Sequence, residues 1–195
     1  AQFRRFNGYH HMNDGGPDNW RDRVENDWPV NGEDDERVVD QLKTIADRLR
    51  ENPYDRRMVC SAWNPNQIHM MSLPACHFCF NVVVYGDKLN LVWHQRSCDF
   101  PKGAPFNIAS YAILLSLLAK HAGLKCGELI GTLNDCHIYD NQIAGAKIQM
   151  EREPFDLPSI ELTHDGDIFN WTHEDIKLVD YSCHPNDIDY GSVTV

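Results

Sequence analysis

Residues 78–94 read FCFNVVVYGDKLNLVWH, and this stretch decides the fold class. Apolar residues recur on both sides of Gly86-Asp87, a dipeptide typical of tight turns between antiparallel strands. The pattern predicts strands over 78–85 and 88–94, joined as a β-hairpin.

The strongest helical pattern follows at 106–122, which reads FNIASYAILLSLLAKHA between Pro105 and Gly123. A helix that is apolar on most of its faces is expected to be buried. A second helix is predicted at about 35–51, where apolar residues recur at helical spacing and Pro53 follows.

Further short strands are predicted at 58–63, 128–133, 160–163, 168–171 and 176–181. Asp165-Gly166 is a second hairpin signal, between 160–163 and 168–171. Strands and helices are mixed without βαβ alternation, so the predicted fold class is α+β. Residues 7–35 are polar and rich in turn formers, which indicates a surface loop or insertion.

Composition narrows the possible partners and compartment. The chain has 195 residues, which suits one domain, and its net charge of −11 argues against binding DNA or an anionic membrane. No run reaches the roughly 18 apolar residues that a membrane span requires. The seven cysteines lack the density of a disulfide framework, so we expect a reducing, cytoplasmic compartment.

The segment Leu73-Pro74-Ala75-Cys76-His77 offers a candidate nucleophile. A cysteine reacts as its thiolate, which nearby cations favour. Taken alone, the segment favours the interpretation of Cys76 as a buried structural cysteine. With Cys79 it also forms a C-x-x-C spacing that could serve zinc or redox chemistry, but no second ligand pair has the spacing of a zinc site, and no metal is predicted.

Cations stand near this cysteine in the sequence. Gln95-Arg96-Ser97-Cys98-Asp99 combines a guanidinium with a hydroxyl, which is a suitable grip for a phosphate. Arg56-Arg57 adds two more cations before a predicted strand. The alternative interpretation of each arginine is a solvated surface side chain.

Asn107 and the pair His137 and Tyr139 complete the candidate set. Asn107 falls in the first turn of the apolar helix, where its amide could read the edge of a pyrimidine or simply start the helix. His137 and Tyr139 are two residues apart in an extended segment, where both could donate to a sugar hydroxyl or fill one face of a strand.

Together and in this order, these segments resemble the thymidylate synthase family. The resemblance covers nearly the whole chain apart from 7–35, and it is carried by QFR (2–4), DRR (55–57), SAWNP (61–65), LPACH (73–77), QRSCD (95–99), GAPFNIASY (103–111), HIY (137–139) and REP (152–154). It implies a mixed sheet around a buried central helix, with two sheets packed together in a homodimer.

The resemblance also implies a reaction. Cys76 would add to the uracil ring of dUMP, which would take a one-carbon unit from 5,10-methylenetetrahydrofolate to give dTMP and dihydrofolate. The implied catalytic residues are Cys76, His77, Arg96 and Asp99. The implied substrate-binding residues are Arg56, Arg57, Gln95, Arg96, Ser97, Asp99, Asn107, His137 and Tyr139. Arg56 and Arg57 would reach the phosphate in the neighbouring subunit. The implied folate-binding residues are Asp99, Lys102, Gly103, Phe106 and Val195.

The match departs from the family in several places. The chain begins inside a family motif, so the usual N-terminal third is absent from 1–195. Lys102 stands where a leucine is usual, His94 where a tyrosine is common and Asn81 where a glutamine is common. These departures leave two alternatives open: a dUMP hydroxymethylase that gives 5-hydroxymethyl-dUMP, and a truncated noncatalytic relative that binds nucleotide.

Overall fold

The computed structural model describes residues 40–65, 68–165 and 167–191. The expected loop at 7–35, the QFR segment and Val195 lie outside the described residues. The main elements are α3 (Gln41–Glu51), β1 (Val59–Ser61), β2 (His77–Tyr85), β3 (Lys88–Asp99), α4 (Ala104–Ala122), β4 (Lys125–His137), α5 (Ile143–Met150), β5 (Ser159–Leu162) and β6 (Ile176–Val179). Short 3-10 helices are η1 (Ile68–Met70), η2 (Asp140–Gln142), η3 (Ile168–Asn170) and η4 (His173–Asp175).

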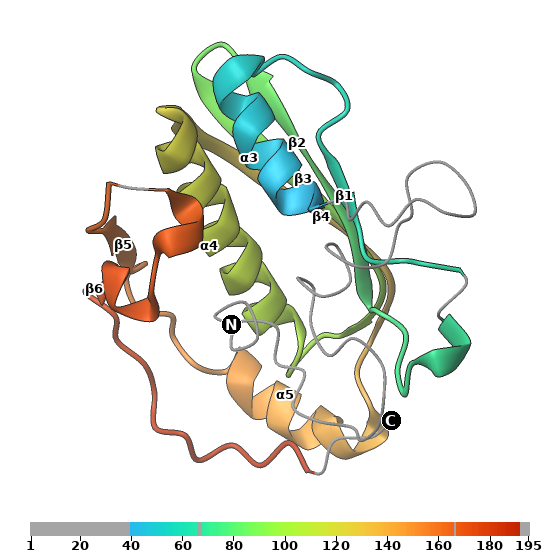
Figure 1. The fold of residues 1–195 in the computed structure, drawn as a ribbon. Coiled ribbons are helices and arrows are strands. Elements are labelled where there is room, and N and C mark those ends of the chain that lie inside the picture. Colours follow the sequence, from blue (N-terminus) through green and yellow to red (C-terminus); the bar gives the residue numbers. More distant parts are fainter. Residues whose placement is uncertain (1–39, 66–67, 166, 192–195) are drawn as a thin grey trace.

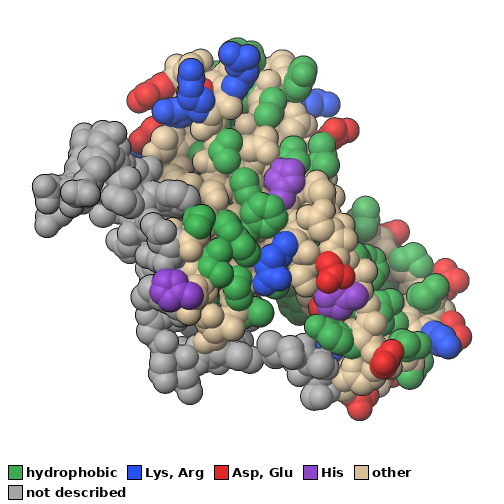
Figure 2. Space-filling view, turned by 90° about the vertical axis from the view of Figure 1, so that its right-hand side faces the viewer, with side chains coloured by type: hydrophobic (Ala, Val, Ile, Leu, Met, Phe, Trp, Pro, Cys, Tyr) green, Lys and Arg blue, Asp and Glu red, His purple; other side chains and the backbone are tan. Residues whose placement is uncertain are grey.

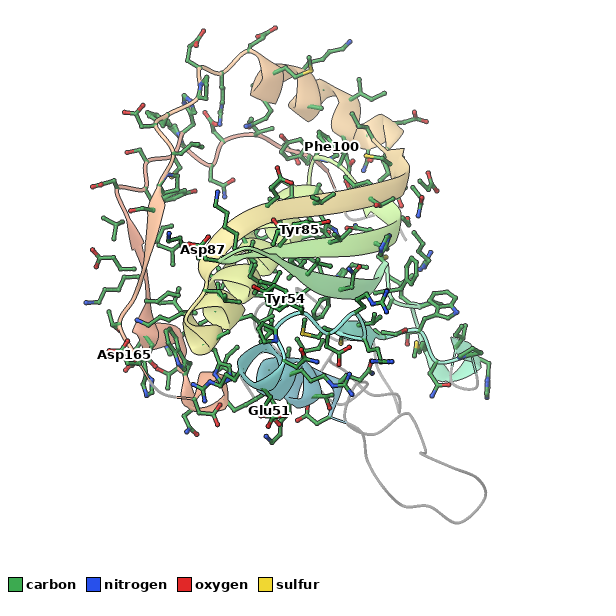
Figure 3. All side chains as sticks on the ribbon, turned by 90° about the horizontal axis from the view of Figure 1, so that it is seen from above. Glu51, Tyr54, Tyr85, Asp87, Phe100 and Asp165 are labelled. Carbon is green, nitrogen blue, oxygen red and sulfur yellow. The ribbon has the colours of Figure 1, made fainter. Side chains whose placement is uncertain are left out.

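A four-stranded mixed sheet, ordered β1-β2-β3-β4, forms the centre of the fold. The helices α3 and α4 lie on one side of it (Figure 1). The predicted hairpin is confirmed, because β2 and β3 pair antiparallel up to Tyr85 and Lys88. Gly86 adopts φ 60° in the turn, a conformation that glycine reaches without steric cost. Tyr54 lies beside this tip and donates to the Gly86 carbonyl at 3.3 Å (Figure 3).

The fourth strand corrects the expectation that no βαβ unit is present. β3 and β4 pair in parallel, from Lys88 with Lys125 to Asp99 with His137. Parallel neighbours need a crossover connection, and α4 supplies it between the two strands. The sheet is therefore mixed, and the end of β3 and the end of β4 meet at the same edge.

The long helix α4 is confirmed, although its burial is uneven. It begins at Ala104, with a proline in its first turn, and ends at Gly123, whose φ of 68° is the usual left-handed cap. Its second half packs into the core through Leu114, Leu115, Leu117 and Leu118. Its first turn is different: Phe106 is 74% exposed, so the prediction of burial along the whole helix is wrong there.

Two other boundaries differ from the predictions. The helix expected at about 35–51 begins at Gln41, because the Asp40 side chain accepts from the Lys43 amide at 2.8 Å and caps it. The second predicted hairpin is wrong, because β5 pairs with β6 and not with 168–171. Ile168 and Trp171 are both buried, and their spacing of three fits a helical turn better than a strand.

The face of the sheet opposite α3 and α4 carries exposed apolar side chains, including Val59, Val83, Tyr85 and Ile130. Alternation along β3 directs Leu89, Leu91 and Trp93 into the core, so the residues between them point to this outer face. Figure 2 shows apolar side chains gathered over the middle of the surface, with basic side chains along the top edge and also beside the apolar group. Among the described residues, no helix is long and apolar enough to cross a bilayer.

Candidate active site

Cys76 lies immediately before β2 and is half-buried. The Arg96 amide donates to the Cys76 carbonyl at 2.8 Å, which ties the start of β2 to the far half of β3. The Arg96 side chain follows: its Nη2 lies 3.9 Å from Cys76 Sγ. One strand pair therefore brings together a thiol and a cation that are 20 residues apart in sequence.

The Arg96 guanidinium is held by the loop that carries the cysteine. Nε donates to the Ala75 carbonyl at 3.2 Å and Nη2 donates to the Pro74 carbonyl at 2.6 Å. The Trp63 ring lies under the guanidinium, 6.0 Å from centroid to Cζ. The loop that carries Cys76 therefore holds the guanidinium within 3.9 Å of the sulfur.

His77 points away from this loop into the core. It is 3% exposed, and its Nδ1 lies 3.1 Å from the hydroxyl oxygen of Tyr111 on α4. The two rings meet edge to face, with centroids 5.6 Å apart. His77 is thus part of a hydrogen-bonded layer behind Cys76, and Tyr111 joins that layer without having been assigned a role from the sequence.

Gln95 and Asn107 form a pair of amides between β3 and α4. Gln95 is 2% exposed, and its Nε2 donates to Asn107 Oδ1 at 3.1 Å and to the Ser97 carbonyl at 2.9 Å. The Trp93 indole donates to Gln95 Oε1 at 3.4 Å. Asn107 lies in the first turn of α4, as predicted, and the buried Gln95 fixes the orientation of its amide.

Asp99 ends β3 and meets the start of α4 through Gly103. The Gly103 amide donates to the Asp99 carbonyl at 2.7 Å. A Cβ on Gly103 would lie 3.0 Å from that carbonyl oxygen and 3.8 Å from Asn107 Oδ1. A side chain at 103 would therefore force the Asp99 backbone to give by a few tenths of an ångström, so glycine allows the closest approach of strand and helix.

The parallel pairing of β3 and β4 brings His137 beside Asp99, since the two residues are register partners. His137 and Tyr139 contact each other edge to face, with ring centroids 4.8 Å apart. The Phe100 amide donates to the His137 carbonyl at 3.0 Å. The sequence placed His137 and Tyr139 together, and the crossover brings the pair to the strand ends that carry Ser97 and Asp99.

Comparison with known proteins matches this arrangement to a family. The family model described as thymidylate synthase covers residues 5–191. The chain belongs to the thymidylate synthase family. Similar proteins include the thymidylate synthase of Mycoplasma pneumoniae (44% identical over 147 residues, 75% of this chain and 51% of that protein) and that of Mycoplasma genitalium (46% over 157 residues, 80% and 54%).

A bifunctional dihydrofolate reductase-thymidylate synthase of Paramecium tetraurelia is also similar, at 44% identity over 146 residues, or 75% of this chain and 32% of that protein. The chain spans about half the length of the curated thymidylate synthases that it matches. The family resemblance drawn from the sequence motifs is therefore confirmed.

The residues that the sequence assigned to folate binding lie farther apart in their contacts than those assigned to nucleotide binding. Lys102 Nζ donates to the Gly191 carbonyl at 2.6 Å, which ties the loop before α4 to the C-terminal segment. Phe106 projects from the first turn of α4 into solvent. Val195 lies outside the described residues.

Arg56 and Arg57 lie in the turn before β1, and both are exposed. Arg57 Nη1 lies 3.4 Å from Asp55 Oδ1, yet 81% of the Arg57 side chain remains exposed. Both arginine side chains are therefore accessible to a second molecule.

All seven cysteines are free thiols, and their environments differ. Burial raises the pKa of the Cys98 thiol to about 12, with a further contribution from the neighbouring Cys136, its register partner on β4. Burial also raises the pKa of Cys60 far above its usual value. Within the described residues, no group of three or more histidine, cysteine or acidic side chains is arranged to hold a metal ion.

One buried residue of this corner had no signal in the sequence. Gln142, in η2, is fully buried and donates to the Asp99 carboxylate at 3.0 Å. A glutamine in a polar turn matches no motif. Only the position of this turn, just after the end of β4, could have indicated that Gln142 lies near Asp99.

Proposed function

We propose that this chain takes part in transferring a one-carbon unit from 5,10-methylenetetrahydrofolate to C5 of dUMP, giving dTMP and dihydrofolate. The observation that carries the proposal is the half-buried Cys76 thiol, 3.9 Å from an arginine nitrogen that two loop carbonyls hold in place. Membership of the thymidylate synthase family supports this chemistry over that of other cysteine nucleophiles.

The nucleotide would be held at three points. Arg96 and Ser97 would bind the phosphate, since a guanidinium and a hydroxyl together suit its oxygens. Asn107 would read the uracil edge, with Gln95 fixing its amide at 3.1 Å. His137 and Tyr139 would donate to the 3′-hydroxyl. Holding both ends of dUMP makes attack by Cys76 effectively unimolecular.

The Cys76 thiolate would then add to C6 of the uracil ring, which places the negative charge on the C5 enolate. That carbon attacks the methylene carbon of the folate. Loss of the C5 proton and elimination of tetrahydrofolate leave an exocyclic methylene, which takes a hydride from the folate. Release of Cys76 from C6 gives dTMP and dihydrofolate. Arg96 would stabilise the thiolate before addition and after release.

The folate would lie against the loop between β3 and α4. Asp99 would hold folate and base together, and Lys102, Gly103 and Phe106 would line the folate side. The exposed Phe106 ring offers an apolar surface to the folate's aromatic system. Val195, at the C-terminus, would help close the site and exclude water from the methylene intermediate.

We extend the proposal to a homodimer formed through the outer face of the sheet. The exposed side chains of Val59, Val83, Tyr85 and Ile130 support it, because apolar groups on one sheet face gain by covering each other. Arg96 is at an outer-face position of β3, so a second subunit on that face would bring Arg56 and Arg57 toward the phosphate. Seven free thiols support a reducing, cytoplasmic setting for that dimer.

The products formed from dUMP and 5,10-methylenetetrahydrofolate test the proposal. We expect dTMP and dihydrofolate in equal amounts. Formation of 5-hydroxymethyl-dUMP with tetrahydrofolate would show that the protein is a hydroxymethylase and contradict the proposed methylation. Binding of dUMP without any product would support the noncatalytic alternative instead.

A further inference from the structure

Gln142 is a buried amide at the corner where β3 and β4 end. It closes the short helix η2 and is 0% exposed. Removing an amide from water costs free energy unless its donor and acceptor are both bonded within the protein. The side-chain oxygen and nitrogen of Gln142 therefore both need hydrogen-bond partners. An apolar residue could fill the same space without that requirement.

Both ends have partners, and both partners are proposed site residues. Gln142 Nε2 donates to Asp99 Oδ2 at 3.0 Å, and Gln142 Oε1 accepts from the Tyr139 amide at 3.2 Å. The backbone N–H of Gln142 also donates to the Tyr139 carbonyl at 2.9 Å. One side chain thus joins the carboxylate at the end of β3 to the backbone of the turn after β4.

The direction of the first bond matters for Asp99. Gln142 occupies Oδ2, while Oδ1 lies 3.4 Å from the Lys102 amide at the start of the loop before α4. Because each oxygen of the carboxylate has a donor, rotation of the group about its Cβ–Cγ bond is restricted. Gln142 supplies the shorter of these two hydrogen bonds.

We infer that Gln142 is a positioning residue that orients the Asp99 carboxylate and the Tyr139 backbone at the same time. The inference rests on the proposed function, because it acts through two residues proposed to bind the nucleotide and folate. Gln142 itself would touch neither reacting atom. Its effect is to hold Asp99 in the plane that suits the folate complex before the ligands arrive, which lowers the cost of organising the site.

The surroundings explain why a purely structural role must be tested separately. The helix α5 follows Gln142 directly, and a Cβ on its Gly145 would lie 3.0 Å or less from atoms of Ile188, Asp189 and Tyr190. The C-terminal segment therefore packs closely on α5. A substitution that shifted η2 would also shift this packing, and thermal unfolding would report it.

Two substitutions separate the roles, made in the whole protein. Gln142→Met keeps the length and bulk but removes both hydrogen bonds. Gln142→Glu keeps the shape and an acceptor but removes the donor, and it sets an oxygen against Asp99 Oδ2. The matched controls are Gln149→Met and Gln149→Glu, because Gln149 is an exposed glutamine on α5.

Orientation of Asp99 should affect the folate step more than nucleotide capture. For Gln142→Met we expect kcat to fall roughly 10- to 100-fold, as for a misplacement of about 1 Å at a reacting group. The dissociation constant of dUMP should rise by less than about threefold, because the contacts proposed for Arg96, Ser97 and Asn107 do not depend on Gln142. Gln142→Glu should be slower than Gln142→Met, and the Gln149 variants should match the parent.

The outcomes are distinct. Retention of kcat within about twofold in Gln142→Met would overturn the inference and leave the proposed function intact. A parallel loss of kcat, dUMP affinity and unfolding temperature would also overturn it, by showing a structural role alone. A parent protein that makes no dTMP would overturn the proposed function, and this inference with it, before any variant is compared.

Discussion

The Nη2 atom of Arg96 lies 3.9 Å from Cys76 Sγ while donating a 2.6 Å hydrogen bond to the Pro74 carbonyl. The cation is thus held against the thiol by the loop that carries the thiol. The contact forms within the chain and needs no bound ligand to bring the cation into place.

Arg96→Lys tests whether this geometry matters beyond charge. A lysine keeps the charge but cannot donate to Pro74 and Ala75 through a planar fork, so it would be held less firmly. We expect kcat/KM for dUMP to fall by roughly 100-fold, from poorer phosphate binding and poorer thiolate stabilisation. Steady-state kinetics measure this. Arg50→Lys is the control, since Arg50 donates to the His121 carbonyl on the exposed surface; an equal loss in both variants would contradict the assignment.

Asn107→Asp tests the proposed reading of the uracil edge. Gln95 Nε2 would still donate to the side-chain oxygen at position 107, but the amide donor would be lost. A carboxylate there prefers the amino group of cytosine to the carbonyl of uracil. We expect the preference for dUMP over dCMP to fall at least about tenfold, as measured by competitive binding of the two nucleotides. Unchanged discrimination would show that Asn107 does not read the base.

Gly103→Ala and Gly123→Ala form a matched pair, since they begin and end the same helix. The new Cβ at 103 would lie 3.0 Å from the Asp99 carbonyl oxygen, so the Asp99 backbone would have to shift by a few tenths of an ångström and activity should fall. The Cβ at 123 meets nothing within 4 Å but takes a φ of 68°, which costs about 1 kcal/mol of folding free energy. Activity assays and denaturant titration separate the two; comparable activity in both variants would mean that the Gly103 contact is not needed.

The cysteines differ in their expected reactivity. Burial raises the pKa of Cys98 to about 12, so its thiol stays protonated as pH rises through 8 and becomes a thiolate only near that value. Iodoacetamide at pH 8 should label the exposed Cys126 and Cys183 in the folded protein and leave Cys98 unlabelled, since the thiolate is the reactive form. Peptide mass spectrometry measures the labelling. Labelling of Cys98 at the rate of Cys126 would contradict its buried, protonated state.

The local parts of the fold could be predicted from the sequence. The β2–β3 hairpin depends on a turn dipeptide and on neighbouring residues, and both are visible in 78–94. The β3–β4 pairing could not be predicted, because it joins residues about 40 apart and β4 contains Gly127 and Gly131, which weaken its strand pattern. Strand pairing was also predicted wrongly around Asp165-Gly166, because the partner of 160–163 is β6 and not the segment directly after the turn dipeptide.

The site shows the same division. Cys76, Arg96 and Asn107 could be proposed as site residues because each lies in a long motif, and the order of these motifs indicates the family. Gln142 was missed because its importance comes from two hydrogen bonds across the fold, to Asp99 and Tyr139, and from burial that the polar turn sequence does not indicate. Motifs identify residues that meet ligands more readily than residues that orient them.

In the proposed reaction, the Cys76 sulfur forms a covalent bond with C6 of the nucleotide. The most direct measurement is trapping by 5-fluoro-dUMP with 5,10-methylenetetrahydrofolate in the whole protein, followed by intact-mass and peptide analysis. Fluorine at C5 cannot leave as a proton does, so the adduct should accumulate. We predict one adduct per active site, located on Cys76 and absent from Cys76→Ser, while Cys79→Ser forms it as the parent does. No adduct with the parent, or an adduct on another cysteine, would contradict nucleophilic attack by Cys76.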